Sequence, residues 1–279
     1  MRLTIWGCRG SLPTPGPRTV DYGGNTSCVE VGLNGGPTLV LDAGTGIREL
    51  GLHLLERRER HIHLLLTHLH LDHLEGLRFF APLWDKEVAL DIWGPPSPLV
   101  SLRERISRSF SPPLFPINLG DVDAHVSFHD VPRGGWTIDS VSLAARLVVH
   151  PGPTVGYRIE SEEATVAYLP DHEPALAGAI EGKPREWISG AAVSADVDLL
   201  LHDAQFFEDE YGERIGWGHS SVADAVAYGR AVGARRLVLF HHEPSHSDSS
   251  LERLEARAQS LAAELRPTLA REGMTIDLP

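Results

Sequence analysis

Three histidines and one aspartate fall within six consecutive residues of this chain. The segment His68-Leu69-His70-Leu71-Asp72-His73 directly follows the apolar run 62–67, which is typical of a buried strand. His68 and His70 are two residues apart, so at a strand end they are expected to project to the same side. Asp72 and His73 come next, where the chain would turn into a helix, and there they could serve a second centre beside the first.

Further histidines and aspartates follow other apolar runs. Four more predicted strands, over residues 142–149, 165–169, 197–202 and 235–241, end in such residues or run directly into them. The residues concerned are His150, Asp171, His172, His202, Asp203, His241 and His242. Open sheets place their sites at strand ends, so we expect the five ends to converge on one rim. This recurrence favours a functional site over a solvated loop with chance histidines.

Imidazole and carboxylate groups without thiolates suit zinc, manganese or iron. The candidate ligands number seven, too many for one tetrahedral ion but suitable for two: His68, His70, Asp72, His73, His150, Asp171 and His241. A carboxylate such as Asp171 can bridge a pair of ions. Two metal ions roughly 3.5–4 Å apart would lower the pKa of a shared water and clamp the attacked and departing oxygens. The expected cofactors are therefore two divalent ions, zinc foremost.

The pattern of apolar residues predicts an α/β fold of two half-sheets flanked by helices. Residues 1–279 are expected to form one domain, since no linker or internal repeat interrupts them. Helices are predicted over 47–58, 99–109, 220–232 and 249–265, with a helical patch over 74–83 and a hairpin turn over 34–36. Strands are predicted over 2–7, 27–31, 38–42, 62–67, 88–93, 124–128, 136–138, 142–149, 154–160, 165–169, 197–202, 235–241 and, at an edge, 274–278.

Residues 97–120 are the least regular stretch. They include the segment Phe110-Ser111-Pro112-Pro113-Leu114-Phe115-Pro116, which is rich in proline and large apolar side chains. The stretch is interpreted either as a lid over the site or as a subunit contact, and a packed surface loop is the alternative.

The chain carries 38 Asp and Glu against 25 Lys and Arg, a formal charge of -13. Such a balance repels a phosphate backbone, so extended nucleic acid is not an expected partner unless a local basic patch exists. Cys8 and Cys28 are the only cysteines and could pair across neighbouring strands. No apolar run approaches the ~20 residues of a membrane span, and residues 2–7 resemble a first strand rather than a signal peptide. A cytoplasmic protein without membrane contact is expected.

These motifs resemble the metallo-β-lactamase superfamily. The match runs from Asp42-Ala43-Gly44-Thr45-Gly46, through His68-x-His70-x-Asp72-His73, to His241-His242-Glu243-Pro244. The resemblance implies a four-layer αβ/βα sandwich of two mixed β-sheets flanked by helices. It also implies that one metal is bound by His68, His70 and His150, the second by Asp72, His73 and His241, and that Asp171 bridges them.

Three further segments resemble the phosphodiesterase branch of that superfamily, which includes tRNA 3′-processing endonucleases and cyclic-nucleotide phosphodiesterases. They are the opening residues 6–11 with 22–26, the segment Leu201-His202-Asp203-Ala204, and the segment Gly216-Trp217-Gly218-His219-Ser220-Ser221. By that resemblance His219 would protonate the leaving oxygen, and Asp203 would orient His219. Asp72 is expected to be catalytic as well as a metal ligand. The alternative for His219 is a helix-start residue beside a capping Ser220.

The leading hypothesis is a two-metal hydrolase of a small phosphodiester, with cyclic nucleotides as the first substrate class. A tRNA 3′-end endonuclease is one alternative, although no basic insertion that could grip tRNA is present in the sequence. A carbon-ester or lactone hydrolase would not need His219, and a metal-binding scaffold would not need the full set of groups. Homodimers are usual in the branch that the chain resembles, so a homodimer is expected.

Polar residues outside this set receive structural interpretations. Asp42 is expected to hold the Gly44–Gly46 turn by hydrogen bonds rather than to touch metal. His172 is expected to tune Asp171, and His202 to point to the opposite face from Asp203. Surface or packing roles are predicted for His53, His61, His63, His125 and His129. A solvated or supporting role beside the ligand loop is predicted for His242 and His246, with phosphate contact as the alternative.

Overall fold

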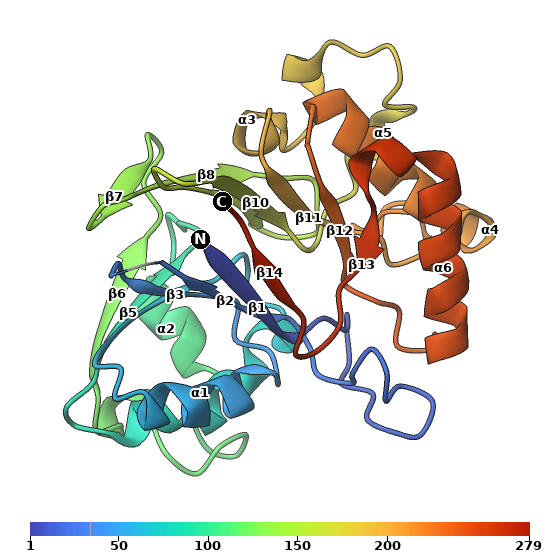
Figure 1. Cartoon of the computed structure of the whole chain (residues 1–279). Coiled ribbons are helices and arrows are strands. Elements are labelled where there is room, and N and C mark those ends of the chain that lie inside the picture. Colours follow the sequence, from blue (N-terminus) through green and yellow to red (C-terminus); the bar gives the residue numbers. More distant parts are fainter. Residues whose placement is uncertain (34) are drawn as a thin grey trace.

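Two seven-stranded mixed sheets face each other in the computed structural model, which describes residues 1–33 and 35–279 (Figure 1). Asn34, in the predicted turn 34–36, lies outside the described residues. The first sheet has the order β14 (Thr275–Asp277), β1 (Arg2–Gly7), β2 (Cys28–Gly32), β3 (Thr38–Leu41), β4 (His61–Leu65), β5 (Ala89–Gly94) and β6 (His125–Asp130). The second has the order β13 (Thr268–Leu269), β12 (Leu237–Phe240), β11 (Leu199–Asp203), β10 (Thr165–Leu169), β9 (Val155–Glu160), β8 (Val141–Leu147) and β7 (Trp136–Ile138).

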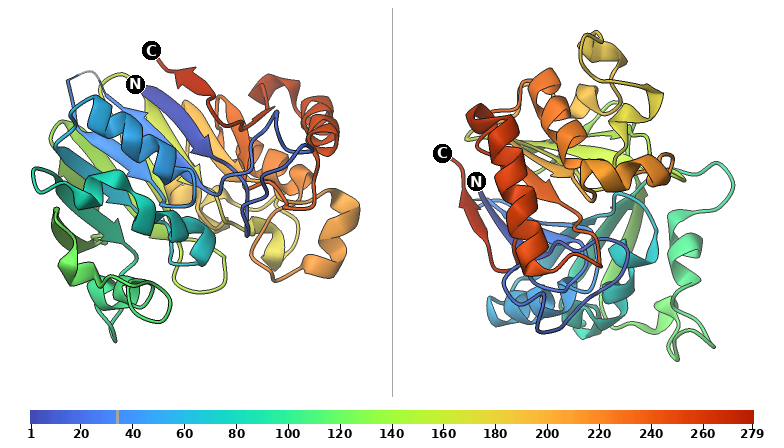
Figure 2. Two further views of the ribbon diagram at one scale, coloured as in Figure 1. Left: turned by 90° about the horizontal axis from the view of Figure 1, so that it is seen from below. Right: turned by 90° about the vertical axis from the view of Figure 1, so that its right-hand side faces the viewer.

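Helices cover the outer face of each sheet, which completes the predicted four layers (Figures 1 and 2). Helix α1 (Ile47–Glu56) and helix α2 (Leu102–Ser107) pack on the first sheet, where their buried side chains share one apolar core with β3, β4 and β5. The second sheet is covered by α3 (Ala191–Ser194), α5 (Val222–Val232) and α6 (Asp248–Leu261). A third core fills the space between the two sheets. The short helix α4 (Glu208–Tyr211) follows β11.

Each sheet has a parallel half, and this sets where the strand ends meet. Strands β3 to β6 are parallel in the first sheet, and β10 to β13 are parallel in the second. Parallel neighbours end at the same edge of a sheet, so the polar residues after β10, β11 and β12 lie side by side. Strand β8 is antiparallel to β9, which is antiparallel to β10, so β8 ends at that same edge.

Most predicted elements are present with shifted ends, and capping explains the largest shifts. The predicted helix 99–109 begins at Leu102 because Ser101 and Glu104 form a reciprocal capping box. The predicted helix 220–232 begins at Val222 because Ser221, not Ser220, caps it. The predicted patch 74–83 is a series of short 3₁₀ turns, and strand β13 was not predicted at all.

The two cysteines do not pair. Both are free and buried, Cys8 in the core between the sheets and Cys28 in the core beneath α1. They therefore project to opposite faces of the first sheet, where no disulfide can join them. Among the described residues, no helix has the length and apolar character needed to cross a membrane.

Candidate metal centre

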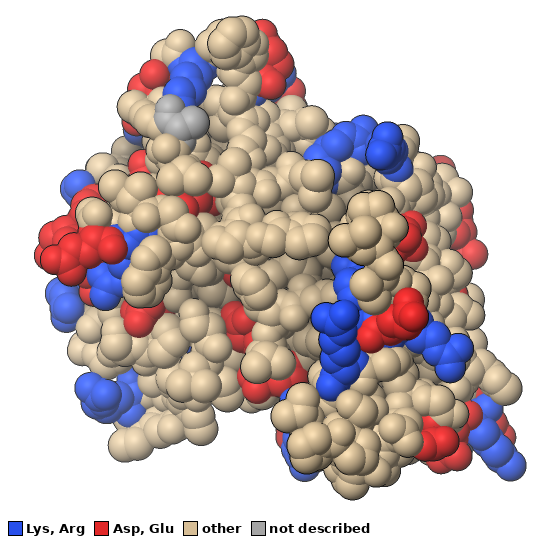
Figure 3. Space-filling view, turned by 180° about the vertical axis from the view of Figure 1, so that it is seen from behind, with Lys and Arg blue, Asp and Glu red and all other residues tan. Residues whose placement is uncertain are grey.

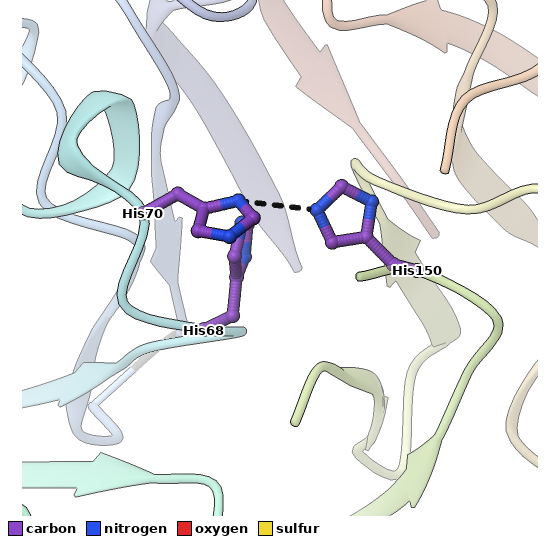
Figure 4. A group of neighbouring side chains, drawn as sticks. All are labelled: His68, His70 and His150. Carbon is purple, nitrogen blue, oxygen red and sulfur yellow. Dashed lines mark hydrogen bonds between the residues drawn. The ribbon is translucent and has the colours of Figure 1, made fainter. Parts of the chain in front are cut away.

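Three histidines converge from two sheets at the rim (Figure 4). His68 and His70 follow β4, and His150 follows β8. Nδ1 of His70 lies 3.2 Å from Nε2 of His150, and the His68 and His70 rings are 4.4 Å apart. One ring nitrogen from each histidine lies within 4.8 Å of the others, as the ligands of a single ion would.

A second group lies directly beside the first. Asp72, His73, Asp171 and His241 again offer ligand atoms within 4.8 Å of one another. Nε2 of His73 lies 3.0 Å from Oδ1 of Asp171, and Nε2 of His241 lies 3.1 Å from Oδ2 of Asp72. The other oxygen of Asp171, Oδ2, faces the first group at 3.7 Å from Nε2 of His68. The two oxygens of this carboxylate therefore point to different groups, as a bridging ligand requires. We call the seven residues the central cluster.

Hydrogen bonds from behind orient the ligand rings. Asp42, at the end of β3, accepts from Nδ1 of His73 at 2.8 Å and from the Tyr168 hydroxyl at 3.0 Å. It also accepts from the backbone N–H of Thr67 at 2.7 Å. The prediction that Asp42 holds the Gly44–Gly46 turn is therefore wrong, because reciprocal bonds between Thr26 and Thr45 hold that turn. A carboxylate behind a histidine fixes which ring nitrogen is left to bind metal.

Burial at two histidines and neighbouring charges at Asp171 shift the pKa of these ligands in the direction that metal binding needs. Burial lowers the pKa of His68 well below its usual value and also lowers the pKa of His150, so both rings keep a free lone pair. For Asp171, burial alone would raise the pKa, but the neighbouring His241 and His73 outweigh burial and hold the pKa well below its usual range. Neutral imidazole and ionised carboxylate are the forms that bind divalent ions.

The residues fit divalent cations by a second, independent test. Nε2 of His68 and Oδ1 of Asp171 are buried polar atoms without a hydrogen-bond partner. An unsatisfied buried polar atom costs about 1–3 kcal/mol, so native structures seldom contain two side by side. Cations bound to the two groups would satisfy these atoms, one at His68 and the other at Oδ1 of Asp171. Nitrogen and oxygen donors without thiolate suit zinc, manganese or iron.

His219 stands at the edge of the central cluster with Asp203 behind it. Nδ1 of His219 lies 2.6 Å from Oδ2 of Asp203, and the His219 ring stacks on His241 with 4.7 Å between centroids. The Asp203 carboxylate is buried at the end of β11 and also accepts from the backbone N–H of Ser220 at 3.0 Å. Burial alone would lower the pKa of His219, but Asp203 outweighs burial and raises it to about 9.

A buried glutamate that sequence reasoning missed holds the loop of His219. Glu173 accepts from the backbone N–H of Gly216 at 2.8 Å, from Gly218 at 2.7 Å and from the Tyr211 hydroxyl at 2.8 Å. Gly218 has a positive φ of 94°, and a Cβ there would lie 2.4 Å from Nδ1 of His150. Only glycine therefore lets the loop pass this close to the ligand histidine.

Two other histidines near the rim serve the interior. Nδ1 of His172 lies 2.9 Å from Nε2 of His202, and both rings are fully buried against Tyr228. The prediction for His172 was that it tunes Asp171. In the structure its side chain contacts His202 instead. The His202 side chain does point away from the Asp203 carboxylate, because it packs against Tyr228 on the helix-covered side of the second sheet. Its Nδ1 lies 2.7 Å from the backbone oxygen of Asp203.

Hollows open on both sides of the central cluster. A cavity of about 390 Å³ is lined by His68, His70 and residues 151–153, together with Arg105, Arg108, Ser109 and Leu114 from the segment 97–120. A second hollow of about 340 Å³ has His219 in its wall, beside Ser11, Gln205, Phe206, Trp217, Glu243 and Pro244. The first hollow therefore reaches His68 and His70 of the central cluster, and the second reaches His219.

The geometry agrees with comparisons to known proteins. A family model described as beta-lactamase superfamily domain matches residues 38–242. The chain belongs to this family. Within it, a ribonuclease Z of Haloarcula marismortui is 26% identical, covering 98% of this chain and 96% of its own. That alignment runs over 310 positions against 279 residues here, so at least 31 positions of the relative have no counterpart in this chain.

Two solved structures share the fold over nearly their whole length. Human tRNase Z, short form, has a TM-score of 0.67 and 21% identity, covering 100% of both chains. A diphosphatase from the PhnP family has a TM-score of 0.70 and 18% identity, covering 100% of this chain and 98% of its own. The chain is therefore a metal-dependent hydrolase of the metallo-β-lactamase superfamily, and its sequence relatives include proteins named ribonuclease Z.

Proposed function

We propose that this hydrolase cleaves phosphodiesters, with two divalent ions, zinc first, held by the central cluster. The observation that carries the proposal is the short contact between His219 and Asp203 at the edge of the central cluster. His68, His70 and His150 would hold one ion, Asp72, His73 and His241 the other, and Asp171 both. Ions held there would supply Lewis-acid activation of water and of the phosphate.

The chain's own residues would handle the departing oxygen. Asp203 occupies Nδ1 of His219, so Nε2 is the nitrogen left to deliver a proton. An alkoxide leaving phosphorus needs such a donor, whereas a carbon ester or lactone does not need one at this position. Asp203 keeps the ring oriented, and Glu173 keeps the loop in place from the opposite side. Asp72, with Oδ2 3.1 Å from His241, would orient the second ligand group.

The substrate with the most support is the 3′ end of an RNA. It rests on the ribonuclease Z relative, which aligns with nearly the whole chain, and on the shared fold of human tRNase Z. This was the alternative hypothesis from sequence, and the comparisons favour it over a cyclic nucleotide.

A small phosphodiester is the second candidate, and specific observations favour it. The chain lacks at least 31 aligned positions of the ribonuclease relative, and its net charge is -13. On the face drawn in Figure 3, Lys and Arg side chains form separate small groups among acidic and uncharged surface. The cavity beside His70 presents two arginines over an apolar floor, which suits a compact anionic substrate.

The segment 97–120 is proposed to act as a lid over that cavity. Leu102, Ile106 and Phe110 anchor it in the core, while Leu114 lines the cavity and is 70% exposed. The expected homodimer stays a prediction, with this segment as its contact, and sedimentation analysis would test it.

Substitution of His219 tests the reaction. His219→Ala should reduce turnover of a dinucleoside phosphate, whose leaving group is an alkoxide, by ~10²–10⁴. The same variant should lose far less with bis(p-nitrophenyl) phosphate, because p-nitrophenolate leaves without a proton. Metal content, measured by elemental analysis, should stay at the wild-type value. His219→Asn is the matched control that keeps a donor to Asp203 but cannot act as an acid. Equal losses with both substrates would refute the general-acid role.

The substrate class needs a separate comparison. The metal-reconstituted protein should be assayed with precursor RNA carrying a 3′ trailer, with cyclic mononucleotides and with a lactone. A kcat/KM highest for the RNA supports the first candidate, and one highest for a cyclic nucleotide supports the second. Turnover of the lactone alone would contradict both.

A further inference from the structure

A separate group of histidines lies at the start of β4, at the opposite end of this strand from His68. His61 and His63 belong to β4, and the register of the sheet pairs His63 with Asp91 of β5. Alternate residues of a strand share a face, so all three side chains project to one face of the first sheet. That is the face toward the second sheet, because Leu65, two residues after His63, lies in the core between the sheets. We call His61, His63 and Asp91 the strand-start cluster.

The contacts within this cluster resemble those of the central cluster. Oδ2 of Asp91 lies 2.7 Å from Nε2 of His61 and 3.8 Å from Nδ1 of His63, and the two imidazole rings are 4.4 Å apart. One ligand atom from each residue lies within 4.8 Å of the others. Ligands about 2.1 Å from a tetrahedral ion lie roughly 3.4 Å from each other, so small side-chain movements would bring the three atoms into position.

His63 carries an unsatisfied atom that points to a missing ligand. Its residue is 6% exposed, and Nδ1 is buried without a hydrogen-bond partner. The 3.8 Å separation from Asp91 is too long for a hydrogen bond but suits two ligands of one ion. Burial also lowers the pKa of His63, which leaves the ring neutral with a free lone pair.

A fourth residue holds the carboxylate from its other side. Nε2 of His129, on β6, lies 2.6 Å from Oδ1 of Asp91. The Trp93 indole stacks on the His129 ring, with 4.3 Å between centroids and 23° between planes. This fixed hydrogen bond turns Oδ2 toward His61 and His63, as outer partners do in metal sites.

We propose that His61, His63 and Asp91 form a second, non-catalytic binding site for a divalent transition-metal ion of the zinc class. His129 orients the carboxylate, and the fourth coordination position is open to water because the side chain of His61 is 58% exposed. Two imidazoles in a set of three exclude magnesium and calcium, which take oxygen ligands. The site binds across β4 and β5 alone, so it does not depend on the central cluster or on the reaction assigned to it.

Zinc stoichiometry tests this proposal directly. Metal-free protein is dialysed against enough zinc chloride to fill both clusters, and bound zinc is counted by elemental analysis. His61→Ala and, separately, Asp91→Asn should each bind one zinc fewer per chain than the wild type. His125→Ala is the matched control, because it removes an exposed histidine of β6 that has no part in the cluster. His61 is exposed and Asp91 is half-buried, so misfolding of one variant would not imply misfolding of the other. Thermal unfolding would show whether each variant is folded.

Further readouts separate this site from the central cluster. Phosphodiester turnover of His61→Ala should equal that of the wild type. When the metal-free proteins are titrated with cobalt chloride, the absorption component of the strand-start cluster should be absent in His61→Ala. Equal zinc content in wild type, His61→Ala and Asp91→Asn would overturn the proposal. Failure of the proposed phosphodiesterase activity would leave these zinc counts unchanged, so the two ideas fail independently.

Discussion

Two clusters of histidine and aspartate lie at opposite ends of β4, and they differ in burial and in the elements that build them. The central cluster draws ligands from both sheets, and all its side chains except His70 are buried. The strand-start cluster draws on β4 and β5 of one sheet, and His61 is exposed. The same residue types thus have different structural effects. An ion in the central cluster would connect the two sheets, whereas an ion in the strand-start cluster would connect only two neighbouring strands.

The largest effect is expected from removing the residue that the two ligand groups share. Asp171→Ala should lose both ions of the central cluster and reduce phosphodiester turnover by more than the ~10–100-fold that loss of an outer partner costs. Elemental analysis would measure the loss. Asp91→Asn is the counterpart at the strand-start cluster and should lose one ion with turnover retained. Full metal occupancy in Asp171→Ala would contradict the bridging role.

Removal of metal should loosen different parts of the molecule. A ligand at about a hundred times its Kd stabilises the folded state by about 2.7 kcal/mol, so chelation should reduce protection by up to ~100-fold. Amide hydrogen exchange should increase at the ends of strands in both sheets when the central cluster is emptied. In the wild type, chelation should also increase exchange in β4 and β5 beside residues 61 and 91. In His61→Ala, chelation should produce no such increase in these two strands. Identical exchange maps would mean that only one metal centre exists.

Smaller effects are expected from the residues behind the ligands. Asp42→Asn should weaken metal binding in the central cluster by ~10–100-fold, because Asp42 accepts on both oxygens and an amide offers only one. Either the backbone N–H of Thr67 or Nδ1 of the buried His73 would then face an NH2 group instead of an acceptor. His129→Ala should weaken zinc binding by less than ~10-fold, since water can reach the half-buried Asp91 and take its place. Competition with a chromophoric chelator would measure both constants. A larger loss in His129→Ala would reverse the proposed difference between the clusters.

Sequence reasoning succeeded where the information is local. The spacing from His68 to His73 and the single polar residues at other strand ends are visible in short stretches, and the structure brings them together. Apolar patterns predicted two half-sheets flanked by helices for the same reason, whereas the four-layer arrangement came from the family resemblance. Helix starts were less accurate, because capping by Ser101 or Ser221 decides them at the level of one residue.

What the sequence could not reveal depends on contacts between distant segments. Glu173 bonds backbone N–H groups 43 and 45 residues away, and no side-chain pattern announces such a partner. The strand-start cluster requires the register between β4, β5 and β6, so its histidines were assigned to surface or packing roles. That Cys8 and Cys28 lie on opposite faces of the first sheet became clear only from the two apolar cores that contain them.

Asp42 and His241 share a backbone feature with a wider meaning. Both have positive φ, at 60° and 64°, a region that side chains other than glycine enter at a cost of order 1–3 kcal/mol. Glycine would relieve this strain, but it would supply neither the acceptor behind His73 nor a ligand. At position 42 glycine would also leave the buried donors of Thr67, His73 and Tyr168 without their acceptor, which costs at least as much as the strain. A search for thermostable variants of this protein should therefore leave these two positions unchanged, although both are strained.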